Sequence, residues 1–281
     1  MTAPTGTNDG PCRGLSLNTA TVRLQWSLAE MIAACRRFGF TGIAPWRDQI
    51  AATGLAETAR RIAGEGLTVT GVCRGGMFPW ADPAGRAAML DDNRRAIEEA
   101  QTLEAECLVL VVGGLPDGSK DLAGARGMVA EALSVLLPEA RAAGVPLAVE
   151  PLHPMYAADR ACINTLAQAL DLCDALGSGL GLALDVYHVW WDPDLFTQIA
   201  RAADRLLAFH VCDWLVPTTD LLLDRGMMGD GIIDIPAIRR AAQAAGYTGH
   251  AEVEIFSADT WWVKPPQDVL KTCRDRYLSV V

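Results

Sequence analysis

Short apolar segments alternate along the chain with longer segments that carry apolar residues at helical spacing. Eight apolar segments, rich in Val, Leu and Ala, are predicted strands: Gly14–Asn18, Gly42–Pro45, Leu67–Cys73, Cys107–Val112, Pro146–Glu150, Gly179–Asp185, Leu206–Val211 and Ala251–Phe256. They are apolar on both faces, which is typical of strands in a parallel sheet that helices cover.

Eight further segments have apolar residues at positions i, i+3 and i+4 and are predicted helices. They are Ser27–Arg37, Asp48–Glu65, Pro83–Glu104, Leu122–Ala143, Asn164–Leu176, Pro193–Ala203, Ile235–Ala245 and Pro265–Arg274. Eight strand–helix units in succession predict an α/β protein with a (β/α)8, or TIM, barrel. A doubly wound open sheet is the alternative fold, but no GxGxxG motif follows the first predicted strand.

The composition is that of a globular domain. Hydrophobic residues make up 51% of the 281 residues and charged residues 21%, and no linker or low-complexity segment interrupts the pattern. We therefore expect one barrel domain over residues 1–281, with the polar, turn-rich residues 1–12 as a flexible tail. No apolar run reaches the roughly 18 residues that span a membrane, so no membrane partner is expected.

Charge and cysteine usage narrow the choice of partners and compartment. The formal net charge of −10 argues against nucleic acid, which a basic face would bind, and suits a small neutral ligand or a metal cation. The 8 cysteines form no CxxC pair, and most lie within apolar runs. We expect them to be reduced and buried, as in a cytoplasmic protein.

Ionisable residues occur near the carboxyl ends of the last four predicted strands. They are Glu150, Asp185, His210 and Glu254, each in an otherwise apolar strand. Catalytic residues of TIM barrels lie at this end of the strands, and burying such groups unpaired would cost several kcal/mol. A divalent cation would supply the counter-charge, so we predict one metal ion held by these four residues. A mixed oxygen and nitrogen site suits Mn²⁺, our first choice, or Mg²⁺, Co²⁺ or Zn²⁺.

Other polar residues near these positions have two interpretations each. Glu252 is expected to point the same way as Glu254 but to lie deeper. It is either a group that supports the metal ligands from behind or a polar residue of the core. Asp213 follows His210 by three residues and either orients its imidazole or faces solvent. His153 follows Glu150 closely and is a candidate for substrate contact, against a purely structural role.

Seven of the 8 tryptophans follow predicted strand ends, which would place them around one mouth of the barrel. Aromatic faces stack on the apolar faces of sugars, so Trp46, Trp191 and Trp214 are candidate substrate-binding residues. The alternative is that some of them seal the ends of helices or a dimer contact.

The segments AVEP, LDVYH, FHVCD, RGMMGDGIIDIP and EVEIF together resemble the sugar phosphate isomerase/epimerase superfamily, with its xylose-isomerase-like TIM barrel. Ketose 3-epimerases and inosose dehydratases belong to it. The resemblance implies that Glu150, Asp185, His210 and Glu254 bind one divalent metal, and that the two glutamates act as catalytic acid and base. It also implies that His188 and Arg225 contact the substrate.

The resemblance implies a metal-dependent isomerase or epimerase that removes a proton next to the carbonyl of a keto-sugar and passes through an enediolate. A lyase that dehydrates or cleaves a 3-keto sugar or glycoside would share the first step, and a mouth rich in tryptophan favours it. A sugar-binding barrel without catalytic activity is a further alternative. The net charge disfavours a metallohydrolase that acts on nucleic acid.

The sequence shows no phosphate-binding motif, because no glycine-rich helix start lies beside a pair of basic residues. Four arginines near predicted strand ends are scattered: Arg23, Arg47, Arg74 and Arg225. We therefore expect an unphosphorylated keto-sugar or keto-glycoside as substrate. Apolar and aromatic loops at the mouth would permit a homodimer or homotetramer.

Overall fold

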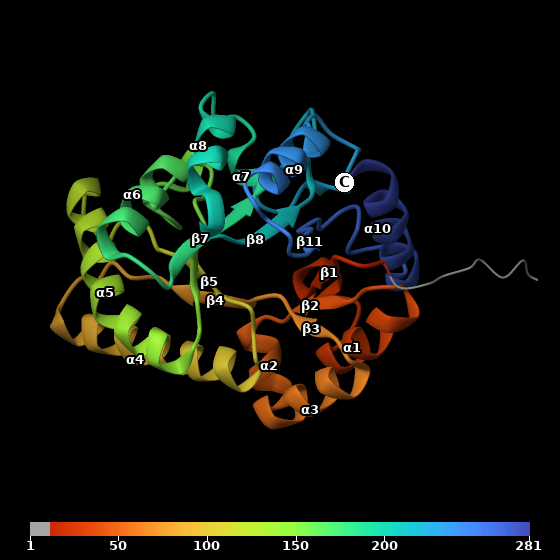
Figure 1. Ribbon diagram of the computed structural model, residues 1–281, viewed down its shortest axis with the longest axis horizontal. Helices are drawn as coiled ribbons and strands as arrows, with labels where there is room; N and C mark the ends of the chain where they lie inside the picture. The colour runs from red at the N-terminus through yellow and green to blue at the C-terminus, as the bar shows by residue number, and fades with distance from the viewer. Residues whose placement is uncertain (1–11) are drawn as a thin grey trace, which may run out of the picture.

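The computed structural model describes residues 12–281, and its strands form a central ring with helices around the outside (Figure 1). The ring strands are β1 (Leu15–Asn18), β2 (Gly42–Ala44), β3 (Thr68–Val69), β4 (Val72–Gly76), β5 (Leu108–Val111), β6 (Leu147–Val149), β7 (Leu180–Asp185), β8 (Leu206–Val211) and β11 (Ala251–Val253). Neighbours are parallel, in the order β3-β2-β1-β11-β8-β7-β6-β5-β4. The TIM barrel predicted from the sequence is thereby confirmed.

The third predicted strand is divided in two. β3 pairs with β2 and β4 pairs with β5, and only two residues of the chain separate β3 from β4. The ring is therefore completed by the chain itself where these two short strands meet.

Helices connect the strands on the outside of the barrel. They are α1 (Leu28–Arg37), α2 (Arg47–Thr53), α3 (Leu55–Glu65), α4 (Pro83–Thr102), α5 (Leu122–Ala143), α6 (Leu166–Leu176), α7 (Val186–Val189), α8 (Leu195–Ala202), α9 (Ile235–Ala244) and α10 (Pro266–Val280). Short 3-10 helices are η1 (Thr19–Val22), η2 (Pro154–Tyr156) and η3 (Ala203–Arg205). None of the helices in residues 12–281 combines the length and apolar character that crossing a membrane requires.

The structure corrects the bounds of one predicted helix and contains short elements that the sequence did not predict. The helix expected over Asp48–Glu65 is two helices, because Gly54 between them has a φ of 92° that no α-helix contains. The tail expected over residues 1–12 lies outside the described residues except for Cys12, which is buried and donates its amide to the carbonyl oxygen of Gly39. The single-turn helix α7 and a hairpin of β9 (Asp213–Trp214) and β10 (Arg225–Gly226) are too short to leave a periodic pattern.

Small side chains fill part of the barrel interior. Cys73, Cys107, Ala148, Ala183 and Ala208 form a buried cluster with Val109, separate from the larger core between strands and helices. All 8 cysteines are buried and free, as the sequence predicts. Because the interior residues are small, the space above them holds larger polar side chains from β8 and β11.

A bulge in β4 shapes the rim of the barrel. The register between β4 and β5 shifts between Cys73 and Gly75, so consecutive residues no longer alternate regularly across the strand. Gly76 has a φ of 107°, and a Cβ atom there would lie 2.0 Å from the carbonyl oxygen of Val111. Glycine is therefore required for β4 to lie this close to β5.

Replacing Gly76 with alanine is expected to lower the free energy of unfolding by about 2–4 kcal/mol, because the methyl group collides with backbone that cannot move away. Gly127→Ala is the matched control, since Gly127 lies inside α5 with open space around it. The control should raise stability by about 0.5–1 kcal/mol. Urea denaturation of both variants measures the difference, and equal stability of the two would contradict the role given to Gly76.

Candidate metal centre and substrate cavity

Four ionisable side chains meet at the carboxyl ends of four adjacent strands. Glu150 follows β6, Asp185 ends β7, His210 lies in β8 and Glu254 follows β11. Each offers a ligand atom within 4.8 Å of those of the others, and all four side chains are buried. The structure thus brings together the whole set proposed from the strand ends, because parallel strands of a barrel all end at the same rim.

Arg225 is the cation that partly balances these carboxylates. Its Nη1 donates to Asp185 Oδ2 and Glu254 Oε2, each at 3.0 Å, and the residue is 3% exposed. The guanidinium carbon lies 4.4 Å from the centre of the Tyr187 ring and 5.1 Å from that of Phe256. The short strand β10 carries Arg225 over the end of the barrel, where the two rings hold it in place.

The buried charges shift one another's pKa. Burial raises the pKa of Glu254 to about 8; the Arg225 guanidinium lowers it, whereas the Glu150 charge raises it further. Burial alone would raise the pKa of Asp185, but Arg225, His188 and His210 together outweigh burial and lower that pKa. Burial alone would lower the pKa of His210, but the carboxylates of Glu252 and Glu150 raise it well above its usual value.

The donor set fits a divalent cation. The carboxyl groups of Glu150, Asp185, Glu252 and Glu254 outnumber the two cationic side chains, Arg225 and His210. The pKa of Glu254 is raised to about 8, so a bound cation would stabilise its ionised form. Carboxylate oxygens and one imidazole nitrogen are ligands of Mn²⁺, Mg²⁺, Co²⁺ and Zn²⁺. The four ligand atoms are also close enough together to contact one ion.

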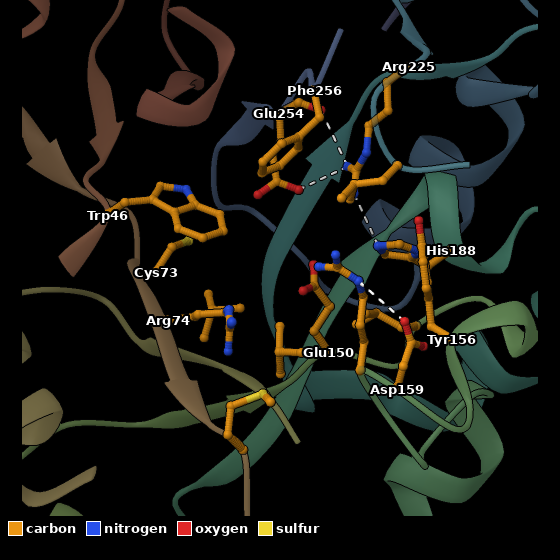
Figure 2. A pocket seen from close by; sticks show the side chains of 16 residues that line it. Trp46, Cys73, Arg74, Glu150, Tyr156, Asp159, His188, Arg225, Glu254 and Phe256 are labelled. Atoms are coloured by element: carbon orange, nitrogen blue, oxygen red, sulfur yellow. Dashed lines mark hydrogen bonds and ion pairs between the residues drawn. The ribbon is translucent and has the colours of Figure 1, made fainter. Parts of the chain in front are cut away.

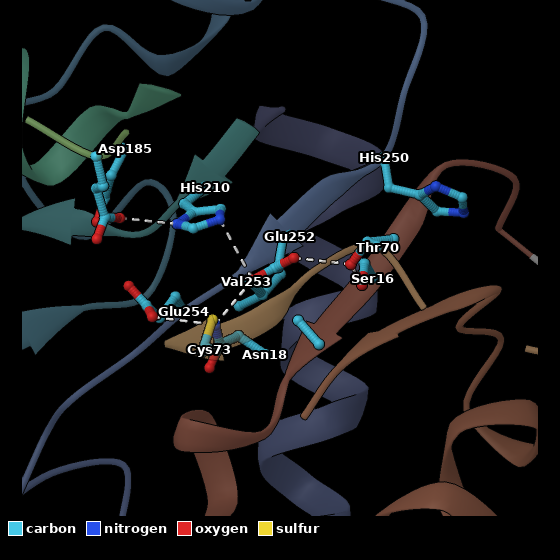
Figure 3. Close-up of polar contacts among 12 residues, drawn as sticks. Ser16, Asn18, Thr70, Cys73, Asp185, His210, His250, Glu252, Val253 and Glu254 are labelled. Carbon is cyan, nitrogen blue, oxygen red and sulfur yellow. Dashed lines mark hydrogen bonds and ion pairs between the residues drawn. The ribbon is translucent and has the colours of Figure 1, made fainter. Parts of the chain in front are cut away.

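Glu252 lies directly behind the cluster and accepts hydrogen bonds from several sides (Figure 3). Asn18 Nδ2 donates to its Oε1 at 2.8 Å and Thr70 Oγ1 donates to its Oε2 at 2.7 Å. His210 Nε2 lies 3.4 Å from Oε1. Its Nδ1 lies 3.1 Å from Glu150 Oε1, so the protonated ring donates to Glu150. Because Glu252 faces Nε2, the ring can keep its proton there, which leaves Nδ1 available as a metal ligand.

Asn18, at the end of β1, joins the deeper Glu252 to the cluster of proposed metal ligands. Its Nδ2 donates to Glu252 Oε1 and, at 3.0 Å, to Glu254 Oε1. Its Oδ1 accepts from Trp46 Nε1 at 2.8 Å and from the amide of Ala20 at 3.0 Å, which fixes the orientation of the amide group. Asn18 ends a predicted strand just as the proposed ligands do, so the same criterion could have identified it.

A cavity of about 340 Å³ opens beside the cluster. Its lining includes Glu150, Glu254, His188 and Arg225 together with the apolar ring of Phe256, and Figure 2 shows these side chains turned toward a common space. The volume lies at the lower end of the range for small-molecule sites and suits a ligand of about one sugar ring. The cavity therefore gives a small molecule access to the proposed ligands.

His188 lies on the wall of this cavity as a neutral side chain. Burial lowers its pKa to about 3, although the carboxylate of Asp185 raises it. Its Nδ1 accepts from the backbone amide of His153 at 3.3 Å, and its Nε2 lies 3.2 Å from Arg225 Nη2. The ring is thus fixed by neighbours on both sides, with one edge at the cavity.

Three residues proposed as substrate contacts do not line the cavity in the described part of the chain. The ring of His153 stacks on Trp214 with centroids 5.1 Å apart and meets the edge of Trp191 at 5.6 Å. Trp191 also donates from Nε1 to the carbonyl oxygen of His188. Trp191 and the backbone amide of His153 thus hold His188 in place. Among the candidate tryptophans, Trp46 does line the cavity.

Asp213 has neither of the roles considered from the sequence. It is fully buried, so it does not face solvent. Its Oδ1 accepts from the amides of Trp214 and Ile233, and its Oδ2 accepts from the amide of Gly229. These bonds use both carboxylate oxygens to hold the loop after β10. Asp213 therefore positions the chain that follows Arg225, and it does not orient the imidazole of His210.

The structure also adds cavity residues that the sequence did not identify. Tyr156 and Arg160 come from the loop after β6, and Phe256 follows Glu254 by two residues on the same side of the chain. The spacing of Phe256 was a usable signal. Nothing in the sequence distinguished Tyr156 or Arg160, because a loop carries no periodicity that predicts where its side chains point.

Glu252→Gln is expected to destabilise the protein. The carboxylate of Glu252 faces donors from Asn18, Thr70 and His210, and glutamine would replace one of its oxygen acceptors with an NH2 donor. We expect a loss of about 1–3 kcal/mol in the free energy of unfolding. We also expect about 10- to 100-fold weaker binding of Mn²⁺. Urea denaturation and titration with Mn²⁺ measure the two effects. Glu98→Gln, on the exposed side of α4, is the control; equal behaviour of the two variants would remove Glu252 from the centre.

Comparison with known proteins gives one curated relative and many similar structures. L-ribulose 3-epimerase from Mesorhizobium japonicum is 31% identical over 130 residues, which cover 46% of this chain and 40% of the relative. The match therefore spans less than half of that enzyme. A crystal structure of protein SMc04130 from Sinorhizobium meliloti 1021 is 61% identical, with a TM-score of 0.94, over 95% of this chain and 98% of that one.

A more distant structure shares the fold. The IOLI protein, in a crystal structure with a binding zinc atom, is 19% identical with a TM-score of 0.83, over 95% of this chain and 98% of that one. The profile of the xylose isomerase-like TIM barrel family matches residues 32–275, which include every ring strand except β1. Because this match extends over most of the chain, the protein belongs to the xylose isomerase-like TIM barrel family.

Proposed function

We propose that this protein is a divalent-metal-dependent isomerase or epimerase that removes a proton next to the carbonyl group of a keto-sugar. The observation that carries the proposal is the buried set of Glu150, Asp185, His210 and Glu254 beside a cavity of about 340 Å³. The partial likeness to an L-ribulose 3-epimerase supports the same class of reaction.

Glu150, Asp185, His210 and Glu254 would hold the ion, and Mn²⁺ is our first choice. When bound, a divalent cation acts as a Lewis acid that stabilises negative charge on the oxygen atoms of a carbonyl compound. Glu252 keeps the His210 imidazole in position from behind through its contact with Nε2. Asn18 holds Glu252 and Glu254 at a fixed separation through one amide group.

Glu150 and Glu254 are the proposed acid and base. They line the cavity from β6 and β11, which are separated in the ring by β7 and β8, so the two carboxylates approach a bound molecule from different strands. One carboxylate takes the proton from the carbon next to the carbonyl, and the other returns a proton. Return to the same carbon gives epimerisation, and return to the neighbouring carbon gives isomerisation.

Arg225 and His188 are the proposed substrate-positioning residues. Both line the cavity, and Arg225 donates to Asp185 and Glu254 from the same guanidinium group. His188 is neutral, so it can donate to or accept from a substrate hydroxyl without adding charge. Trp46 and Phe256 supply apolar surface for the carbon skeleton of a sugar.

Removal of the metal is expected to stop proton exchange. In D2O, the protein with Mn²⁺ should catalyse uptake of deuterium at the carbon next to a ketose carbonyl, and EDTA should abolish it. NMR detects the exchange, and the product distinguishes epimerase from isomerase. A product that has lost water or a glycoside group would assign a lyase. No exchange and no stoichiometric metal would contradict the proposal and assign a binding protein.

Glu254→Gln is expected to reduce the exchange rate at least about 100-fold, because it removes the base while keeping the size of the side chain. Circular dichroism checks that the variant folds, and metal analysis shows whether it still binds Mn²⁺. Glu98→Gln serves as the control on the protein exterior. Exchange by the Glu254 variant at the rate of the unchanged protein would exclude this residue as the base.

A further inference from the structure

Arg74 projects toward the cavity because of the bulge in β4. In a regular strand, Cys73 and Arg74 would point to opposite faces, but both line the cavity here. The register with β5 shifts at this place, between Cys73 and Gly75. Bulges next to active sites commonly redirect a side chain in this way. Figure 2 shows Arg74 on the side of Trp46 and Cys73, across the cavity from His188 and Arg225.

The guanidinium of Arg74 has no hydrogen-bond or ion-pair partner among residues 12–281. Its basic neighbours differ in this respect: Arg23 pairs with Asp48, and Arg47 pairs with Asp92 and Glu99. Arg74 is also partly buried. A guanidinium in such a place loses part of its hydration and gains no partner in return.

A second guanidinium on the cavity lining is weakly paired. Arg160 lies 3.8 Å from Asp159, with side chains that are 44% and 65% exposed, and it packs over the ring of Tyr156. Exposed pairs at this distance contribute little energy, so Arg160 can exchange partners. Arg74 and Arg160 line the same cavity. Burial lowers the pKa of Arg74, the charge of Arg160 lowers it further, and the charge of Glu150 raises it. Both remain charged at neutral pH.

We propose that Arg74 and Arg160 form an anion subsite that holds an oxyanion group of the substrate, so that the keto-sugar is acidic. The inference rests on the proposed function for the metal end of the cavity, where Glu150 and Glu254 lie. Two guanidinium groups present planar donor pairs that match the geometry of a carboxylate or a phosphate. The protein's net charge of −10 repels anions in general, so local cations are needed to bind one.

This subsite changes the picture drawn from the sequence, in which the arginines near strand ends were scattered and a neutral substrate was expected. Arg23 and Arg47 remain engaged with carboxylates, and Arg225 belongs to the metal cluster. Arg74 is joined instead by Arg160, from a loop more than 80 residues later in the chain. The resulting cavity is lined by the proposed metal ligands Glu150 and Glu254 and also by the guanidinium groups of Arg74 and Arg160.

The test compares three sugars that share one carbon skeleton: D-fructose, D-fructuronate and D-fructose 6-phosphate. Isothermal titration of the Mn²⁺-loaded protein should show at least about ten-fold tighter binding of one acidic sugar than of D-fructose. Preference for D-fructuronate assigns a carboxylate to the subsite, and preference for the 6-phosphate assigns a phosphate. Equal binding of all three, or no binding of any, would overturn the inference.

Arg74→Gln and Arg160→Gln should each reduce the preference for the acidic sugar to less than about three-fold, because each removes one guanidinium. Arg160 is exposed, so its variant tests the subsite even if the Arg74 variant does not fold. Arg60→Gln is the control, since Arg60 pairs only with Glu57 on α3 and should keep the full preference. Preference that survives both cavity variants would show that the acid binds elsewhere, for example at the metal.

The same samples separate this inference from the proposed function. Deuterium exchange is measured by NMR on each of the three sugars in D2O. Preference for an acidic sugar without exchange on any of them would leave the subsite standing and refute the chemistry. Exchange on D-fructose with no acid preference would support the chemistry and refute the subsite.

Discussion

The cost of burying negative charge governs the arrangement of this barrel. Glu150, Asp185 and Glu254 are buried at one rim, with Glu252 directly behind them. An isolated buried carboxylate costs several kcal/mol, so each needs donors or a counter-ion. The protein supplies Arg225, His210 and Asn18 as cation and donors, and these do not balance every negative charge. The remaining excess is what makes the site suited to a divalent cation.

The same constraint explains features of the fold that lie away from the cluster. The barrel interior is filled by small residues such as Ala148, Ala183 and Ala208, so there is space above them for His210 and Glu252. Ser16 and Asn18, from the neighbouring strand β1, and Thr70, from the junction of β3 and β4, then provide polar groups. A core of large aliphatic residues would have excluded this second layer of hydrogen bonds.

The cavity combines surfaces that differ in charge and in rigidity. The wall with the proposed metal ligands is built from strand ends and is fixed by buried contacts, such as those of Arg225 with the rings of Tyr187 and Phe256. Its other wall depends on a strand bulge and a loop, which hold Arg74 and Arg160 without strong partners. We expect the rigid wall to carry the chemistry that is common to a family. We expect the residues of the other wall, which can accept a ligand, to select the substrate.

The sequence by itself determined the barrel and the set of proposed ligands. Alternating apolar and helical segments define eight strand–helix units, and parallel strands of a barrel end at one rim, so Glu150, Asp185, His210 and Glu254 had to meet. Only the tertiary structure decided which other residues reach the cavity. His153 and Trp214 stack on each other and do not line it, whereas Arg74 does, and Asn18 bonds to Glu254. Beyond a strand end, the direction of a side chain depends on loop conformation, bulges and packing, and none of these leaves a periodic pattern in the sequence.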